Sequence, residues 1–144
     1  SMINVFCVLL FCGLASLNNY RLVFEEYRTQ YDQNAWNTSE IGKVVAEFLD
    51  GADSSRNAYV VPYPHWVDTR LVGFNAGFPG RDFALWQEDL HLTLNDSGEK
   101  LFIFKPDDAE TRKILQELYP RGTKAIFYPR VSGREFIIYT VLDE

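Results

Sequence analysis

The sequence has little that would support a disulfide, a metal site or a cofactor. Its 144 residues include two cysteines, Cys7 and Cys12, and two histidines, His65 and His91. Five helical positions separate the cysteines by about 7.5 Å along the axis, beyond the normal reach of a disulfide. The cysteines and histidines also lack the spacing of a zinc site. We therefore expect no disulfide, no metal ion and no cofactor.

The sequence also lacks a basic block that would compensate for its acidity. Twenty acidic residues outnumber 14 basic ones, which gives a net charge of −6. Such a chain repels a nucleic-acid backbone, so we exclude a nucleic-acid partner. With 47% hydrophobic residues the chain is not disordered, and its length is that of one folded domain.

Catalytic motifs are absent as well. Gly73, Gly77 and Gly80 do not have the spacing of a phosphate-binding loop. Glu88 and Asp89 are adjacent, and adjacent helical residues do not face one another as a glycosidase pair must. Neither histidine has a serine or cysteine poised beside it in the pattern of a triad. We expect the chain itself not to be catalytic.

The N-terminal part of the chain is a long apolar run. Residues 3–17 contain no charge. As a helix they would measure about 22 Å, short of the roughly 30 Å hydrocarbon core. Three interpretations compete: the end of a membrane span, a core or oligomer helix, and a signal peptide. The signal peptide is supported by the cleavage-like Gly13-Leu14-Ala15, but no lysine or arginine precedes the run.

An aromatic stripe continues the apolar run as a helix. Its members recur at steps of three and four: Leu17, Tyr20, Phe24, Tyr27 and Tyr31. A cleaved signal peptide needs no such continuation, so we interpret residues 1–31 as the end of a membrane span and 32–144 as a soluble α/β domain. The segment after the span has no basic excess, which favours the extracytoplasmic side. The helix could also mediate oligomer formation.

The first helix of the domain has the sequence signature of a capping box. Asn37-Thr38-Ser39-Glu40 places a glutamate three positions after an N-cap residue. The apolar residues that follow lie on one helical face: Ile41, Val44, Val45, Phe48 and Leu49. Gly51 is expected to end this helix.

Three short apolar runs predict buried strands. They are Ala58–Val61, Leu101–Phe104 and Ala125–Tyr128, and a proline follows each. Residues 107–118 predict a helix between the second and third strands, and hence a right-handed parallel crossover. Residues 135–142 predict a fourth strand, paired antiparallel to the third as a hairpin.

The stretch between residues 69 and 95 has a weaker pattern. Its glycines predict loops, Phe83, Trp86 and Leu90 a short helix, and Leu90, Leu92 and Leu94 an edge strand. The fold class is therefore α/β: a small mixed sheet of four or five strands, mostly parallel with an antiparallel C-terminal hairpin. Helices flank the sheet, and a long N-terminal helix precedes it.

The carboxyl ends of the parallel strands predict a ligand-binding edge, where α/β sheets usually hold ligands. The loops there carry Tyr63, His65, Trp66, Asp68 and Arg70, then Lys105 and Asp107, and finally Arg130. Aromatic rings stack on sugars and carboxylates accept hydrogen bonds from hydroxyl groups, so a carbohydrate or a phosphate headgroup suits this edge. In the alternative interpretation, Trp66 covers the core and Asp68 pairs with Arg70 or caps a turn.

Two segments carry a resemblance to a known family. They are Trp36–Gly42, after the aromatic-rich helix, and Pro64-His65-Trp66-Val67-Asp68-Thr69-Arg70, after the first strand. In this order they resemble the extracytoplasmic tail that follows the last membrane span of multi-spanning glycosyltransferases of the dolichyl-phosphate-mannose protein mannosyltransferase type. Those enzymes transfer a sugar from a polyprenyl phosphate, using acidic residues in loops near their first spans.

The resemblance implies a non-catalytic accessory domain outside the cytoplasm, which contacts the acceptor or the lipid-linked sugar donor. No catalytic residue of that family has a counterpart here. A second hypothesis is a membrane-anchored or secreted binding module for carbohydrate or another ligand, unconnected to a transferase. A third is a small enzyme that uses the strand-end residues.

Overall fold

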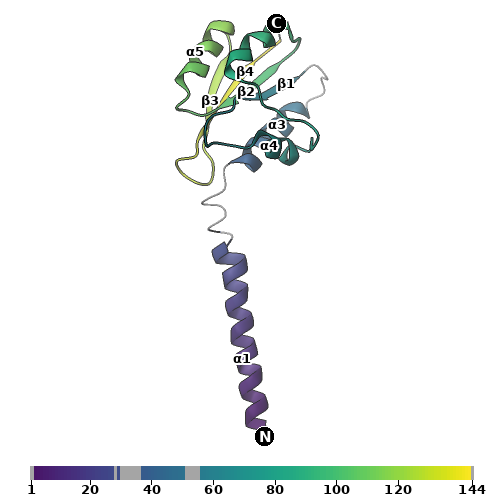
Figure 1. The fold of residues 1–144 in the computed structure, drawn as a ribbon, viewed down its shortest axis with the longest axis vertical. Coiled ribbons are helices and arrows are strands. Elements are labelled where there is room, and N and C mark those ends of the chain that lie inside the picture. The colour runs from purple at the N-terminus through teal and green to yellow at the C-terminus, as the bar shows by residue number, and fades with distance from the viewer. Residues whose placement is uncertain (1, 28, 30–36, 51–55, 144) are drawn as a thin grey trace. The chain divides into compact units, whose positions relative to one another are not determined.

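The structure, a computed structural model, describes residues 2–27, 29, 37–50 and 56–143. The chain divides into two units, Ser1–Ala35 and Trp36–Glu144 (Figure 1).

The first unit is a helix whose apolar side chains are exposed. Helix α1 spans Met2–Tyr20, and a π-helical segment, η1, continues it over Arg21–Glu26. No residue of either element is buried. Together they form 25 helical residues, about 37 Å, so this helix is long and apolar enough to cross a membrane. The long N-terminal helix is confirmed; Tyr31, the last member of the aromatic stripe, lies outside the described residues.

The second unit is built on a mixed sheet of four strands in the order β1-β2-β4-β3. The strands are β1 (Asn57–Val60), β2 (Lys100–Phe104), β3 (Thr123–Phe127) and β4 (Phe136–Val141). β1 pairs with β2 in parallel, and β4 pairs antiparallel with both β2 and β3. The predicted α/β class and the antiparallel C-terminal hairpin are confirmed.

The position of β4 was not expected from the sequence. Because β2 and β3 are both antiparallel to β4, the strands β1, β2 and β3 point in one direction. The crossover from β2 leads to a strand, β3, that is not adjacent to β2 in the sheet. The chain then reverses direction, and β4 lies between β2 and β3. The parallel direction was predicted correctly, but β2 and β3 are not neighbours.

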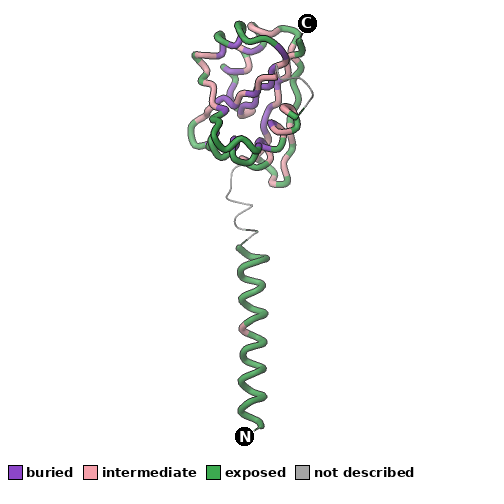
Figure 2. The backbone as a smooth tube through the Cα atoms, turned by 90° about the vertical axis from the view of Figure 1, so that its right-hand side faces the viewer, coloured by how far each residue is buried: buried purple, intermediate pink, exposed green. Residues whose placement is uncertain are grey.

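Helices cover both faces of the central strands. One face packs against α3 (Thr38–Leu49) and α4 (Thr69–Asn75), and the other against α5 (Ala109–Leu118) and the 3-10 helix η2 (Gln87–Asn95). The first core contains Ile41, Val45, Val60, Val72, Leu101, Ile103 and Phe136. The second contains Leu90, Phe102, Phe104, Leu115, Ile137 and Tyr139. Figure 2 shows these buried segments at the centre of the unit.

The weakly patterned stretch follows its prediction only in part: Gly77 and Gly80 lie in turns as expected, and a 3-10 helix includes Leu90. Residues 69–75 form α4 instead of a loop, and Leu90 to Leu94 lie in η2 instead of an edge strand. Leu90 and Thr93 are the buried residues of η2, so a helical step of three prevails over the alternation of leucines. Instead of an edge strand, an isolated bridge between Val60 and Ala84 lies at the outer edge of β1. Val60 N–H donates to the Phe83 carbonyl there at 2.8 Å.

The capping box predicted for α3 does not form. Asn37 is the N-cap residue, but its side chain makes no capping hydrogen bond; its amide donates to the Arg134 carbonyl. The Glu40 carboxylate accepts a hydrogen bond from Arg130 N–H at 3.3 Å. Both residues therefore hold the β3–β4 loop against the start of α3. Gly51, the expected end signal, lies outside the described residues.

Gly73 permits a close backbone contact beneath α4. The residue is buried, and a Cβ atom there would lie 2.1 Å from the Arg81 carbonyl oxygen. The Gly73 carbonyl also accepts a hydrogen bond from Phe78 N–H at 2.9 Å, so the backbone cannot easily withdraw.

Gly73→Ala should lower the free energy of unfolding by about 1–3 kcal/mol, since the added methyl group overpacks a backbone contact. Urea unfolding followed by tryptophan fluorescence measures the change. Gly80→Ala is the control: a Cβ there meets no atom within 4 Å, and its effect should stay within about 0.5 kcal/mol. Equal losses for the two variants would show that the Gly73 contact does not matter.

Candidate functional site

The adjacent carboxyl ends of β1 and β2 bring together an aromatic ring, a cation and a carboxylate. Lys105 Nζ lies 4.9 Å from the centroid of the Tyr63 ring and 3.3 Å from Asp107 Oδ2. Tyr63 packs against the first core, while the Asp107 side chain is 73% exposed. The structure thus joins Tyr63 and Lys105 from two loops that are far apart in the sequence.

The chemistry of this group is that of weak polar recognition. The Lys105 ammonium lies over the Tyr63 ring, where a cation–π contact contributes about 0.5–1 kcal/mol at an exposed site. Lys105 therefore already occupies the face of the Tyr63 ring on which a sugar would stack. The exposed Asp107 carboxylate remains able to accept hydrogen bonds from hydroxyl groups.

Trp66 belongs to the core and not to an open surface. Its exposed fraction is 6%, and it lies in the first core with Val72 and Phe83. Its backbone N–H donates to the Tyr63 carbonyl at 3.2 Å, which closes the turn after β1. The indole ring thus has little accessible surface for stacking on a sugar.

Asp68 and Arg70 serve the start of α4. Asp68 Oδ1 accepts a hydrogen bond from Arg70 N–H at 2.9 Å, which makes Asp68 the N-cap residue of this helix. The Arg70 side chain is 85% exposed and lies 3.9 Å from Asp82 Oδ2. An ion pair so exposed contributes little to stability. The capping alternative described for Asp68 is the one that the geometry shows.

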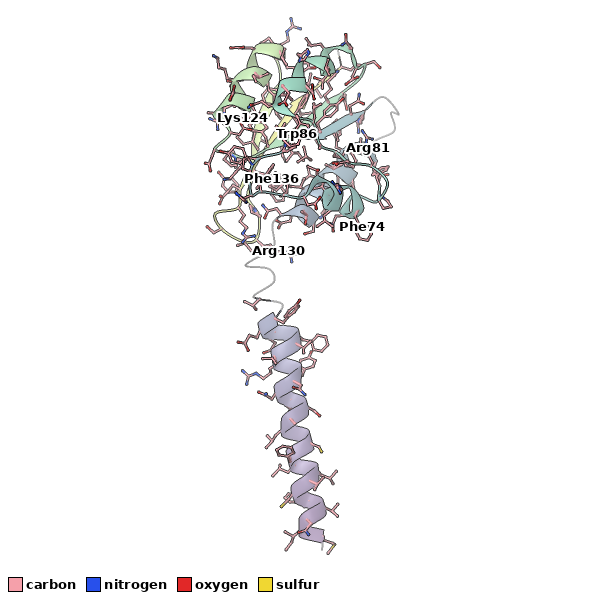
Figure 3. All side chains as sticks on the ribbon, in the orientation of Figure 1. Phe74, Arg81, Trp86, Lys124, Arg130 and Phe136 are labelled. Carbon is pink, nitrogen blue, oxygen red and sulfur yellow. The ribbon has the colours of Figure 1, made fainter. Side chains whose placement is uncertain are left out.

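His65 and Arg130 stand apart from the Tyr63–Lys105 group. His65 is exposed and has a φ of 54°, in the left-handed region, which serves the tight turn before Trp66. Arg130 lies on the loop after β3 and contacts Glu40 through its backbone (Figure 3). The carboxyl end of β3 lies at the same end of the sheet as those of β1 and β2, but β4 lies between β3 and these two strands.

A buried network at the start of α5 was missed at the sequence level. The Asp108 carboxylate accepts hydrogen bonds from Thr111 N–H at 2.9 Å and from the Thr111 hydroxyl at 2.6 Å. Gln87 of η2 donates to Asp108 Oδ1 at 3.3 Å. A helix N-terminus next to a strand end can bind an anion, and here the protein's own carboxylate occupies that position. The spacing of Asp108 and Thr111 signals the cap, whereas Gln87 reaches it only through the fold.

The phenols on the second face of the sheet are held in their protonated form. Burial raises the pKa of Tyr59, and its hydrogen bond to the Asp96 carboxylate raises that pKa further. Burial also raises the pKa of Tyr119, against the lowering effect of its hydrogen bond to Thr93, and the pKa of Tyr139. The Tyr59 hydroxyl donates to the Asp96 carboxylate and the Tyr139 hydroxyl to the Tyr119 carbonyl, so we assign these phenols a structural role.

Potential metal ligands are not clustered. Within residues 2–27, 29, 37–50 and 56–143, no group of three or more histidine, cysteine, aspartate or glutamate residues could hold a metal ion. Cys7 and Cys12 are free and exposed on α1.

Comparison with known proteins identifies no relative. No protein-family model matches the chain, and neither the curated proteins nor the solved structures contain a match.

Trp66→Ala should lower the free energy of unfolding by about 3–5 kcal/mol, because it removes a large buried side chain from the first core. Trp86 provides a matched control, since its side chain is 57% exposed; Trp86→Ala should cost about 0.5 kcal/mol or less. Urea unfolding followed by circular dichroism measures both changes. A Trp66→Ala variant as stable as Trp86→Ala would contradict the core assignment.

Proposed function

We propose that this chain is the extracytoplasmic accessory domain of a membrane glycosyltransferase that uses a polyprenyl-phosphate sugar donor. In this role the chain is anchored by α1 and binds or positions a reactant, while the chemistry takes place elsewhere in the enzyme. The observation that carries the anchoring is the helix Met2–Glu26, which is apolar, long enough to cross a bilayer and without a buried residue.

The exposed side chains of α1 explain why a membrane is the environment that suits it. Phe6 is 67% exposed, Phe11 73% and Leu14 59%. Burial of apolar surface contributes about 25 cal/mol per Å², so a helix that is apolar on all sides is strongly stabilised in lipid. The first charged residue is Arg21, so the uncharged part of the helix covers all of α1.

The extracytoplasmic side is supported by the charges at the C-terminal end of the helix and just after it. Arg21 and Arg28 are balanced by Glu25 and Glu26, and Arg21 lies 3.6 Å from Glu25. Cytoplasmic flanks usually carry an excess of lysine and arginine. A flank without that excess fits the opposite side of the membrane.

The assignment to a glycosyltransferase depends on the sequence resemblance of Trp36–Gly42 and Pro64–Arg70 to the tail of such enzymes. The Tyr63–Lys105 pair supports a second candidate function, a membrane-anchored binding module unconnected to a transferase. An aromatic ring, an ammonium group and the exposed Asp107 carboxylate are suitable partners for a polar ligand such as a carbohydrate.

The anchoring and its orientation can be measured with cysteines. In a chain that carries Gln116→Cys on the exposed surface of α5, a membrane-impermeant maleimide should label residue 116 in intact spheroplasts. Cys7 and Cys12 should stay unlabelled, because a membrane-impermeant reagent does not enter the lipid that surrounds them. The Cys7→Ser/Cys12→Ser chain with Gln116→Cys is the control. Labelling of residue 116 only in inside-out vesicles would place the domain in the cytoplasm and contradict the proposal.

The chain alone should transfer no sugar, since the proposal places the catalytic residues elsewhere. The measurement uses the full chain in lipid nanodiscs with a radiolabelled polyprenyl-phosphate sugar and a peptide acceptor. Transfer above the rate of empty nanodiscs would contradict an accessory role. Binding of the lipid-linked sugar without transfer would support the proposal, whereas binding of a free sugar only, lost in Lys105→Met, would favour the binding module.

A further inference from the structure

Strand β3 is an open edge of the sheet. It pairs with β4 on one side, while the opposite edge of the sheet is partly covered through the contact of Val60 with the Phe83 and Leu85 backbone. Within the described part of the chain, no strand or bridge adjoins the outer side of β3. Its outward N–H and C=O groups are therefore a template for another strand.

The side chains of β3 are exposed on both faces of the sheet. Thr123 to Ile126 are exposed and Phe127 is half-buried. The main helix–strand contacts of α3 are with β1 and β2, so β3 extends beyond the helical cover. Ile126 is 46% exposed, and Tyr128, just after the strand, is 74% exposed. A strand added here would cover apolar surface on both faces.

The sequence segment that contains β3 has a charge opposite to that of the rest of the chain. Residues 121–134 contain four basic residues and no acidic one. The chain has 14 basic and 20 acidic residues in all, so the remainder has ten basic and 20 acidic residues. The segment thus has a charge of +4 and the remainder −10. Lys124 lies on β3 itself and Arg130 on the loop that follows (Figure 3).

This charge argues against a second copy of the chain as the occupant. Antiparallel pairing of β3 with its own copy would bring two segments of charge +4 together, and like charges across a strand pair destabilise it. Lysine on an edge strand also protects against self-association. An acidic strand avoids this repulsion and gains attraction from the same residues.

We propose that β3 binds an acidic, extended peptide segment of a partner protein as a fifth strand. The backbone of the peptide pairs with the outer edge of β3, in the manner of strand addition to an exposed sheet edge. Its carboxylates lie toward Lys124 and Arg130, and its apolar residues lie on the opposite face of the sheet, beside Ala125 and Phe127. This inference stands independently of the glycosyltransferase proposal.

The test uses the full chain in detergent micelles and a fluorescein-labelled peptide of alternating glutamate and valine. Fluorescence polarisation should show binding of this peptide. The same peptide with N-methylated backbone nitrogens on alternate residues, and a lysine–valine counterpart, should bind at least about tenfold more weakly, because one loses backbone pairing and the other reverses the charge.

Charge-neutralised variants distinguish the effect of the charges near β3 on binding from the effect of the net charge of the chain. Lys124→Gln with Arg130→Gln should weaken binding of the acidic peptide by about threefold to tenfold at low salt. Lys43→Gln with Lys113→Gln removes the same charge from exposed positions on α3 and α5 and should change binding by less than about twofold. Equal effects of the two pairs would overturn the local role of β3.

Hydrogen exchange locates the binding. Amides within residues 123–127 should gain protection when the acidic peptide is added. The proposal is overturned if protection appears elsewhere or not at all, or if the lysine–valine peptide binds equally well. It is also overturned if the chain dimerises through these amides and Lys124→Gln with Arg130→Gln strengthens the dimer, since the occupant is then a second copy.

Discussion

Strand β2 is buried along its whole length, and the second unit is arranged around that burial. Flanked by β1 and β4, β2 presents side chains to both faces of the sheet, so both faces need cover. Leu101 and Ile103 enter the core with α3 and α4, and Phe102 and Phe104 enter the core with α5 and η2. Lys100 fits the buried strand because its ammonium group donates to the Gly98 carbonyl at 2.9 Å.

The same arrangement uses most of the polar groups at the strand ends for structure. Asp68 caps α4 and Asp108 caps α5, so the two helix starts that could receive an anion are occupied by carboxylates of the chain. Lys105 is shared between Tyr63 and Asp107. Among the residues that the structure describes, none pairs with the outer backbone edge of β3. Recognition through backbone pairing suits such a domain better than chemistry at the strand ends.

The two units differ in how they arrange their apolar side chains. α1 is apolar on all sides and has no buried residue, as suits a helix in lipid. The second unit has two cores of its own. In the proposed function, α1 anchors the chain and the second unit presents a surface near the membrane. This role is common to the glycosyltransferase proposal and to the binding-module alternative.

The sequence alone determined the elements whose local pattern was unambiguous. The helical spacing of Ile41 and Val45, the apolar run Leu101–Phe104 and the short turn before β4 were sufficient for α3, β2 and the hairpin. These features depend on neighbouring residues, and the periodicity of a helix or strand can be read from them directly. The apolar character of α1 is equally local.

The tertiary structure decided which strand lies at the edge and which polar groups find partners. β4, with buried Phe136, Ile137 and Tyr139, takes the central place, and β3, with Lys124 and Ala125, is left outside. The sequences of β3 and β4 both have the pattern of a strand, and this pattern does not show which strand lies at the edge. The prediction that β3 is buried was wrong, because Thr123 to Ile126 are exposed. The outcome depends on which pairing covers more apolar surface, a comparison between distant segments. For the same reason Asn37 and Glu40 bind the β3–β4 loop rather than each other. Their partners, Arg134 and Arg130, lie 97 and 90 residues away in the sequence, so no local pattern could predict these contacts.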